Sequence, residues 1–256
     1  MYQYIPPQNN PVPILLSIPH CGTLIPPHLG LQTTVCPDTD WFLRELYDFA
    51  PSLGIGVLYA TYARYVVDLN RSPQSTPLYS DGRIITDAIP LQQFDGTPLY
   101  TTPPTPTEKS DRIKKYFQPY HGQLHARLQQ LYKKFGIALL FDAHSIKRFV
   151  PTIHPLPFPD LILGSNDHRS ARPAIIDHAW KWLNEAPFHT RHNTPFKGGY
   201  ITRTYGQPDQ GIHALQLEMS QDIYMNEEKQ TWNSEKARPI ADFLRDFLSH
   251  LITVVS

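Results

Sequence analysis

Short apolar runs alternate along the chain with longer segments of helical spacing. Several of these runs are continuous, without the polar residue at every second position that marks a strand with one face in water. Continuous runs of this length are typical of strands that are covered on both faces of a sheet. The predicted strands are residues 14–18, 55–59, 65–69, 137–141, 161–163 and 214–218.

Four longer segments place apolar side chains three or four positions apart, which predicts helices with one buried face. They are residues 40–53, 108–135, 169–184 and 234–253. Asp38 or Thr39 can cap the first, and Pro119 predicts a kink or break in the second because it lacks a backbone N–H. Strands and helices that follow each other in this way predict an α/β sandwich around a mostly parallel or mixed sheet.

Proline is unusually common. The 26 prolines cluster at residues 6–27, 73–119 and 151–173, with apolar and aromatic residues between them. This mixture indicates long ordered loops, because a linker between domains would lack the apolar residues. The 256 residues are enough to bury one large core, and we expect a single domain over residues 1–256.

Charge and cysteine content narrow the class of partner. Lys plus Arg and Asp plus Glu number 23 each, so the chain lacks the basic surplus of proteins that bind nucleic acids or anionic membranes. Cys21 and Cys36 form no CxxC pattern, and no apolar run approaches the roughly 18 residues that span a bilayer. The N-terminus also lacks the order of a signal peptide. We expect reduced thiols, a cytoplasmic location and a small-molecule partner.

Polar side chains follow four of the predicted strands at the point where each strand ends. In open α/β sheets, ligands bind at the carboxyl edge, so these side chains are expected to share one site. They are His20, residues 68–71, residues 142–145 and Glu218.

Two of these residues are histidines at the ends of separate strands, which favours a metal site. A hydrolytic metal site needs about three protein ligands, an open position for water and a carboxylate that moves protons. His20 and His144 supply two ligands, and Glu218 supplies the proton-moving carboxylate.

The third ligand is an acidic residue that the pattern leaves open. Asp38 and Asp40 both precede the helix predicted at residues 40–53, and we assign Asp40 as the ligand and Asp38 as a cap or a residue next to the ligands. Asp142, two residues before His144, can instead orient the ligating imidazole.

Two arginines in loops predict binding of carboxylates. Arg71 and Arg203 carry planar guanidinium groups, which bind a carboxylate through two parallel hydrogen bonds. Gly198 and Gly199 lie shortly before Arg203, where they allow a ligand to approach the backbone or simply form a tight turn.

Other sources of chemistry are less well supported. His121 and His125 have ligand-like spacing on a predicted helix, but no Glu follows His121 as in HExxH, which favours histidines of the core or surface. The chain also lacks GxSxG, GxGxxG and GxxxxGK[ST] motifs, which argues against a serine hydrolase and against binding of NAD, ATP or GTP.

Eight motifs, taken together and in this order, resemble the N-formylglutamate amidohydrolase family over almost the whole chain. That family in turn resembles the zinc carboxypeptidases and aspartoacylases. The motifs are LLSIPHCGTLIP, DTDWFLRELYDFA, YARYVVDLNRSP, TPLY, FDGTPLY, LLFDAHSI, FKGGYITRTYGQP and HALQLEMSQDIYM.

The resemblance implies a three-layer α/β/α sandwich of the zinc-carboxypeptidase type, with His20 and His144 as metal ligands and Glu218 as the proton carrier. It also implies that Asn70 and Arg71 hold a substrate carboxylate. The carboxypeptidases have an acidic ligand three residues after their first histidine, where this chain has Thr23, so the resemblance does not supply the third ligand.

The expected reaction is hydrolysis of N-formyl-L-glutamate, a dicarboxylate, to formate and L-glutamate in histidine degradation, with a divalent metal such as zinc. Cobalt, nickel and iron also suit two histidine ligands. An alternative substrate is another N-acyl or N-formimidoyl amino acid. A second alternative is a non-catalytic carboxylate-binding protein, which would need the arginines but neither the metal ligands nor Glu218. The oligomeric state stays open.

Overall fold

A computed structural model describes residues 1–74 and 87–255. Its main feature is a seven-stranded sheet with the strand order β1-β3-β2-β4-β7-β5-β6, and a two-stranded ribbon, β8-β9, lies apart from it. The strands are β1 (Tyr2–Ile5), β2 (Ile14–Ile18), β3 (Gly56–Ala60), β4 (Ala138–Ile146), β5 (Leu161–Gly164), β6 (Thr190–His192), β7 (Ile212–Ser220), β8 (Met225–Asn226) and β9 (Thr231–Trp232).

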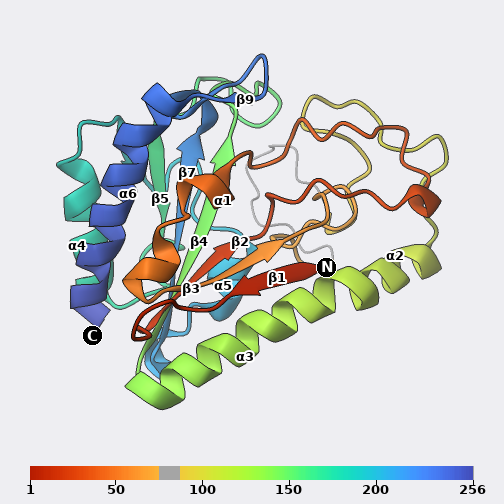
Figure 1. Ribbon diagram of the computed structural model, residues 1–256. Coiled ribbons are helices and arrows are strands. Elements are labelled where there is room, and N and C mark those ends of the chain that lie inside the picture. Colours follow the sequence, from red (N-terminus) through yellow and green to blue (C-terminus); the bar gives the residue numbers. More distant parts are fainter. Residues whose placement is uncertain (75–86, 256) are drawn as a thin grey trace.

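The sheet is mixed, as the sequence predicts. Its centre is parallel: β3, β2, β4 and β7 run in the same direction. On the outside of this block, β1 is antiparallel to β3 and β5 is antiparallel to β7, while β6 is parallel to β5. The four central strands therefore bring their carboxyl ends to one edge (Figure 1).

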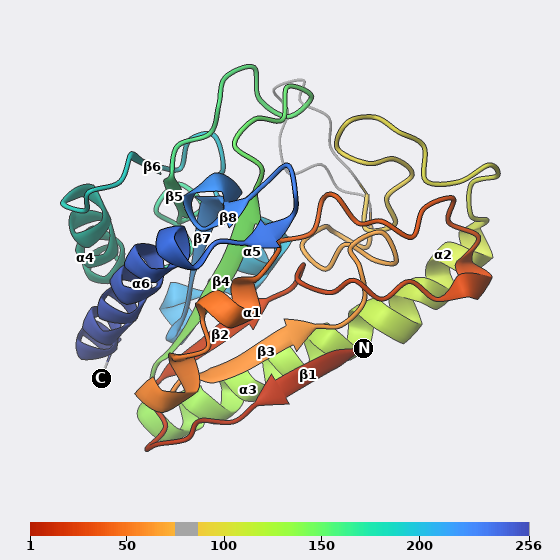
Figure 2. The ribbon, with the colours of Figure 1, turned by 45° about the horizontal axis from the view of Figure 1, so that its top comes forward.

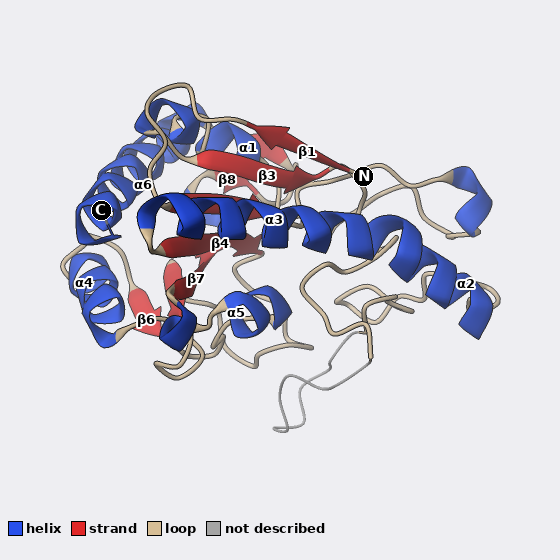
Figure 3. Ribbon diagram, turned by 90° about the horizontal axis from the view of Figure 1, so that it is seen from below, coloured by secondary structure: helices blue, strands red, loops and turns tan. Residues whose placement is uncertain are grey.

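Helices cover both faces of the sheet and make three layers (Figures 1 and 2). On one face α6 packs against α4 and α1, and on the other α3 lies across β2 and β4 while α5 packs against β7 (Figure 3). The α-helices are α1 (Leu43–Leu46), α2 (Pro106–Arg112), α3 (Gln118–Phe135), α4 (Pro173–Asn184), α5 (Tyr200–Tyr205) and α6 (Ser234–Val255). Short 3-10 turns lie at Pro27–Leu29, Ala50–Leu53, Pro208–Gln210 and Gln221–Ile223.

The continuous apolar strands are buried from both sides, because neighbouring residues enter different cores. In β2, Leu16 and Ile18 pack into the core under α1, α4 and α6, whereas Leu15 packs into the core under α3. Ser17 points to the α3 side as well, where its hydroxyl lies 3.1 Å from that of Tyr120. This explains the absence of alternation in the sequence.

Two predicted elements differ from the structure. Residues 65–69 are a buried loop and not a strand: Val66 N donates to Ala63 O, and Asp68 N donates to Ala88 O. The helix predicted at residues 40–53 is reduced to α1 and a following 3-10 turn, and no side chain caps α1 at its N-cap Phe42. Neither Asp38 nor Thr39 is therefore a helix cap.

The predicted helix at residues 108–135 exists as α2 and α3 joined by a π-helical turn, Ile113–Phe117. Pro119 lies in the first turn of α3, directly after this wider turn. The predicted break at Pro119 thus takes the form of a change in helix type.

Strands β4 and β7 are longer than predicted, with nine residues each. Asp142 and His144 therefore lie inside β4, and Glu218 lies inside β7. The TPLY motif at residues 76–79 lies outside the described residues. No helix in the described part of the chain is long and apolar enough to cross a membrane.

Candidate metal centre

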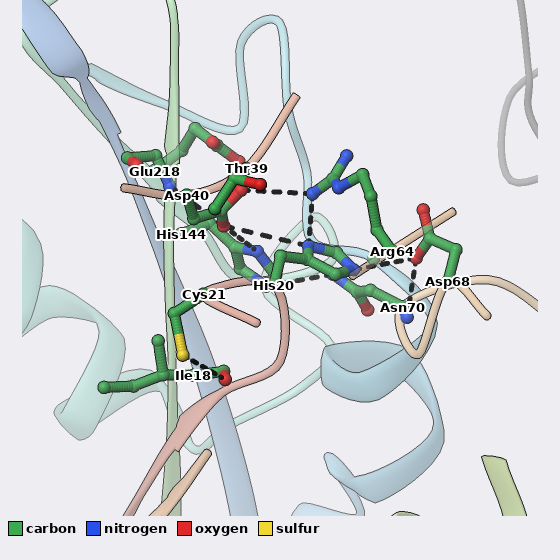
Figure 4. A network of polar contacts seen from close by, with 12 residues as sticks. Ile18, His20, Cys21, Thr39, Asp40, Arg64, Asp68, Asn70, His144 and Glu218 are labelled. Carbon is green, nitrogen blue, oxygen red and sulfur yellow. Dashed lines mark hydrogen bonds and ion pairs between the residues drawn. The ribbon is translucent and has the colours of Figure 1, made fainter. Parts of the chain in front are cut away.

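Three of the predicted ligands meet at the carboxyl edge of the sheet. His20 follows β2, Asp40 precedes α1, and His144 lies near the end of β4. One possible ligand atom from each lies within 4.8 Å of the others, and all three side chains are buried (Figure 4). Nδ1 of His144 is 3.1 Å and Nδ1 of His20 is 3.7 Å from Oδ2 of Asp40.

The second nitrogen of each imidazole faces its own buried carboxylate. Nε2 of His20 lies 2.8 Å from Oδ1 of Asp68, and Nε2 of His144 lies 2.8 Å from Oδ2 of Asp142. With the Nε2–H donating to a carboxylate, Nδ1 of each histidine presents its lone pair to Asp40. Histidines that bind metals have this arrangement in general.

The donor set fits a divalent cation. Two imidazole lone pairs and a carboxylate converge in a buried space, and such acceptors repel one another unless a positive charge lies between them. The Arg64 guanidinium, which contacts Nδ1 of His20 and Oδ1 of Asp40, meets part of this need. Burial would lower the pKa of His144, but Asp142 and Asp40 raise it well above its usual value. His20, Asp40 and His144 are therefore the residues that can hold a metal.

Both orienting carboxylates are fixed by further hydrogen bonds. Oδ1 of Asp68 also accepts from the backbone N–H of Asn70 at 2.9 Å, and Oδ1 of Asp142 accepts from the Ser17 hydroxyl at 2.8 Å. Burial alone would raise the pKa of Asp68, but the charges of His20 and Arg71 lower it. Hydrogen bonds thus hold both carboxylates in place beside their imidazoles.

Arg64 is a residue of this site that sequence reasoning did not single out. One of its terminal nitrogens contacts Nδ1 of His20 and donates to Oδ1 of Asp40 at 3.1 Å. Its guanidinium lies 4.9 Å from the ring centre of Phe94. The sequence feature that could have pointed to Arg64 is its charge, because the start of the YARYVVDLNRSP motif is otherwise apolar and aromatic.

Asp38, the alternative third ligand, has a different environment. Its Oδ2 accepts from the Tyr65 hydroxyl at 2.7 Å and from the backbone N–H of Phe94 at 2.9 Å. Asp38 therefore connects two loops next to the centre, and Asp40 is the carboxylate that lies with the two histidines.

Glu218 lies on β7 directly opposite His144 on β4, so that the two side chains share one face of the sheet. Burial raises the pKa of Glu218 to about 8, with a further contribution from the Asp40 carboxylate, while His144 and Arg64 oppose the shift. Nε2 of Gln216 donates to Oε2 of Glu218 at 3.4 Å. A carboxyl group with a pKa near neutrality can both accept and return a proton.

The residues predicted to bind a substrate carboxylate lie on the α3 side of His144. Nδ2 of Asn70 is 3.0 Å from Nε2 of His144, and Oδ1 of Asn70 accepts from Ile201 N at 2.8 Å. A Cβ atom on Gly199 would lie 2.3 Å from Nδ2 of Asn70, so only glycine fits there. The close approach at Gly199 is thus one between its backbone and the side chain of Asn70.

The two arginines differ in their surroundings. Nη1 of Arg71 donates to the Asn70 carbonyl at 3.1 Å, and its Nε is buried without a hydrogen-bond partner among the described residues. Nε of Arg203 donates to the carbonyl of Gly198, which has a left-handed φ of 109°. An unpartnered buried N–H requires an acceptor, which a ligand carboxylate can provide.

His121 lies away from these ligands. Its ring hydrogen-bonds to the Leu69 carbonyl at 2.9 Å and to the Tyr205 hydroxyl at 3.0 Å, and it stacks on Phe117. Burial lowers its pKa to about 4. His121 is thus a neutral histidine of the core, as the sequence favours.

The chain is an α/β protein with a mixed sheet between two helical layers. Two histidines, an aspartate and a glutamate gather at the carboxyl edge of the sheet, and these are residue types that hydrolases use for catalysis. The chain belongs to the N-formylglutamate amidohydrolase family, whose family model matches residues 12–225.

Known proteins similar to the chain carry the same name. An N-formylglutamate deformylase from Pseudomonas aeruginosa is 40% identical over 94% of this chain and 93% of its own length. Another from Pseudomonas putida is 38% identical over 94% and 92%. The crystal structure of an N-formylglutamate amidohydrolase from Ralstonia eutropha JMP134 superposes with a TM-score of 0.83 at 25% identity, covering 99% of this chain and 96% of that one.

Proposed function

We propose that this protein hydrolyses N-formyl-L-glutamate to formate and L-glutamate with a divalent metal held by His20, Asp40 and His144. The observation that carries the proposal is the buried ligand set beside Glu218, in a chain whose relatives are named N-formylglutamate deformylase. We further propose that the metal is zinc, which prefers two histidines and a carboxylate with one open position.

Substrate binding is assigned to the cationic groups at the carboxyl edge. Arg71 has an unpartnered Nε beside the centre, and Arg203 lies on α5, whose first turn is fixed to Asn70. These two guanidinium groups would bind the two carboxylates of the glutamyl part, and Asn70 would keep Arg71 in place through its carbonyl. The substrate is thus a small dicarboxylate.

The chemistry divides between the ligand set and two charged side chains. A bound divalent metal would polarise the formyl carbonyl and lower the pKa of a water molecule. Glu218 accepts the proton of the attacking water and returns it to the leaving nitrogen as the C–N bond breaks. Arg64 contacts Asp40 beside the ligand set, where its guanidinium would stabilise the negative charge that develops on the carbonyl oxygen.

The cellular setting of the proposal is histidine degradation in the cytoplasm. Formylglutamate hydrolysis yields glutamate, the amino acid that such a pathway delivers. Cys21 and Cys36 are both free thiols, which is typical of reducing compartments.

The decisive experiment measures formate release from N-formyl-L-glutamate by the purified protein, before and after treatment with a chelator and after zinc is restored. We expect chelation to abolish release and zinc to restore it. Release that continues at full rate in a metal-free protein would refute metal dependence, and no release by the zinc-loaded protein would refute the substrate.

A matched pair of variants tests the proton carrier. Glu218→Gln should lower kcat by about 10²–10⁴-fold, because a general base contributes that much, while metal content stays unchanged. The control is Glu185→Gln on the exposed end of α4, which should keep wild-type kcat. A Glu218→Gln protein with wild-type kcat would assign the proton transfer to another group.

A further inference from the structure

Asp40 lies in a segment whose backbone is strained. Phe42, two residues after it, has a φ of 59° and a ψ of 13°, in the left-handed region that bulky side chains rarely adopt. A residue in this region persists only where contacts with the surrounding protein hold it there. The contacts of residues 39–42 therefore decide where the Asp40 carboxylate lies relative to the two histidines.

Two side chains hold this segment by backbone carbonyls on both sides of Asp40. Nε2 of Gln221 donates to the carbonyl of Thr39 at 2.8 Å. The hydroxyl of Tyr224 donates to the carbonyl of Trp41 at 2.9 Å, and this carbonyl belongs to the peptide bond that enters the strained residue. The segment is thus held on either side of the ligand by residues that lie 182 and 183 positions further along the chain.

Ser145 joins the same network from β4, where it directly follows the ligating histidine of that strand. Its Oγ lies 2.8 Å from the Tyr224 hydroxyl and accepts from Nε2 of Gln221 at 3.4 Å. Its backbone N–H donates to Oδ2 of Asp40 at 3.2 Å. The network therefore connects the segment that carries Asp40 with the strand that carries the second histidine ligand.

The network is buried. The exposed fractions of Ser145, Gln221 and Tyr224 are 4%, 2% and 0%. A hydrogen bond in such surroundings is stronger than one in water, and a buried carbonyl that loses its donor is left unsatisfied. Removing either donor would therefore release the strained segment and displace the Asp40 carboxylate.

Gln221 and Tyr224 come from the part of the chain that follows the proposed proton carrier. Strand β7 carries Glu218, and the 3-10 turn Gln221–Ile223 directly follows this strand. These residues form the last part of the HALQLEMSQDIYM motif, and residues 38–41 begin the motif DTDWFLRELYDFA. The network thus gives a role to parts of both motifs that the ligands and Glu218 do not account for.

We propose that Gln221 and Tyr224 are positioning residues of the metal centre, which hold the strained segment so that the Asp40 carboxylate meets the metal together with the two histidines. The inference rests on the proposed function, because it takes Asp40 as a ligand of a divalent metal. Replacing a residue that orients a metal ligand typically lowers the metal affinity by about 10–100-fold. We expect a decrease of at least about tenfold when either side chain loses its hydrogen bonds.

The test compares two variants of the purified protein that each lose one buried tyrosine hydroxyl. Tyr224→Phe removes the bond to the Trp41 carbonyl. The hydroxyl of Tyr47 has no hydrogen-bond partner among the described residues, so Tyr47→Phe is the matched control. In competition with a chromophoric chelator, the zinc dissociation constant should be at least about tenfold above wild type for Tyr224→Phe and within about twofold for Tyr47→Phe.

A second variant and a second readout separate positioning from stability. Gln221→Met keeps the length of the side chain and removes both donor bonds, and it should also raise the zinc dissociation constant by at least about tenfold. The visible absorption of bound cobalt depends on the geometry of its ligands. The cobalt spectra of Tyr224→Phe and Gln221→Met should therefore differ from wild type, whereas that of Tyr47→Phe should match it.

The outcomes separate the two proposals. Wild-type zinc dissociation constants and cobalt spectra in folded Tyr224→Phe and Gln221→Met refute the positioning role and leave the proposed function intact, even if urea titrations show a loss of stability. An equal rise of the dissociation constant in Tyr47→Phe also refutes the positioning role. A wild-type protein that binds zinc but releases no formate from N-formyl-L-glutamate refutes the proposed substrate alone, and one that binds neither zinc nor cobalt refutes both proposals.

Discussion

The bond between Asp142 and His144 gives the sharpest quantitative prediction about metal binding. Asp142 is fully buried, and its Oδ2 lies 2.8 Å from Nε2 of His144. The variant Asp142→Asn keeps the size of the side chain and a hydrogen-bond acceptor but removes the negative charge. It therefore isolates the charge that makes the imidazole a stronger donor to a metal.

The expected magnitude follows from the two kinds of hydrogen bond. A hydrogen bond to a charged group contributes about 1.5–3 kcal/mol, and a neutral one about 1 kcal/mol. The loss of about 0.5–2 kcal/mol corresponds to a dissociation constant for zinc that is about 2–30 times higher. This overlaps with the 10–100-fold effects typical of such orienting residues.

The assay is competition for zinc between the protein and a chromophoric chelator at constant pH. Ser17→Ala serves as control, because it removes the hydrogen bond to Oδ1 of Asp142 but keeps the charge at His144, and it should change the zinc dissociation constant less. A folded Asp142→Asn protein whose dissociation constant stays within twofold of wild type would show that His144 does not depend on this carboxylate, or does not bind the metal.

Three further predictions concern the packing, the pH dependence and the substrate clamp. Gly199→Ala should lower the free energy of unfolding by about 1–3 kcal/mol in urea titrations, since its Cβ would lie 2.3 Å from Asn70. The control Gly122→Ala, whose Cβ would have no atom within 4 Å, should not destabilise its helix. Equal free energies of unfolding for the two variants would contradict the contact at Gly199. Burial lowers the pKa of His121 from 6.5 to about 4, so the unfolded chain takes up a proton first as the pH falls. Between pH 7 and pH 5 the wild-type protein should thus lose about 2 kcal/mol of stability more than His121→Gln, and parallel pH curves would rule this out. Arg71→Ala should raise KM for N-formylglutamate by about tenfold or more with a smaller change in kcat, and steady-state kinetics with an unchanged KM would assign the clamp to another residue.

The apolar pattern predicts burial better than it predicts conformation. Residues 14–18 and 65–69 are both apolar runs followed by polar residues, yet only the first is a strand. In residues 65–69, Tyr65 packs into a separate small cluster while Val66 packs into the core under α3. One backbone bond of this loop is local, from Val66 N to Ala63 O, and another, from Asp68 N to Ala88 O, reaches a loop twenty residues further along the chain. The apolar pattern did not predict strand β1, because β1 is a half-exposed edge strand with no continuous apolar run.

The site was predictable where its residues follow central strands. His20 and His144 end two apolar runs, and the structure places them with Asp40 in one buried set. Asp68 enters the site from residues 65–69, the buried loop that the sequence pattern assigns to a strand, and Arg64 directly precedes this loop, so the directions of both side chains could not be derived. Asp68 belongs to the polar stretch 68–71 that the sequence places at the site, but its partner His20 lies 48 residues earlier, so no signal in the sequence pointed to their pairing.

The π-helical turn between α2 and α3 constrains the length of the chain. Such a turn contains one residue more than an α-helical turn, and each helical residue rotates the next by about 100°. On one side of it Arg112 donates to the Tyr100 hydroxyl at 2.6 Å, and on the other Tyr120 meets Ser17 at the sheet. Deleting a single residue from Ile113–Phe117 would turn one of these faces by about 100° out of phase. Insertions and deletions should therefore be far less tolerated in this π-helical turn than in the solvent-exposed loops.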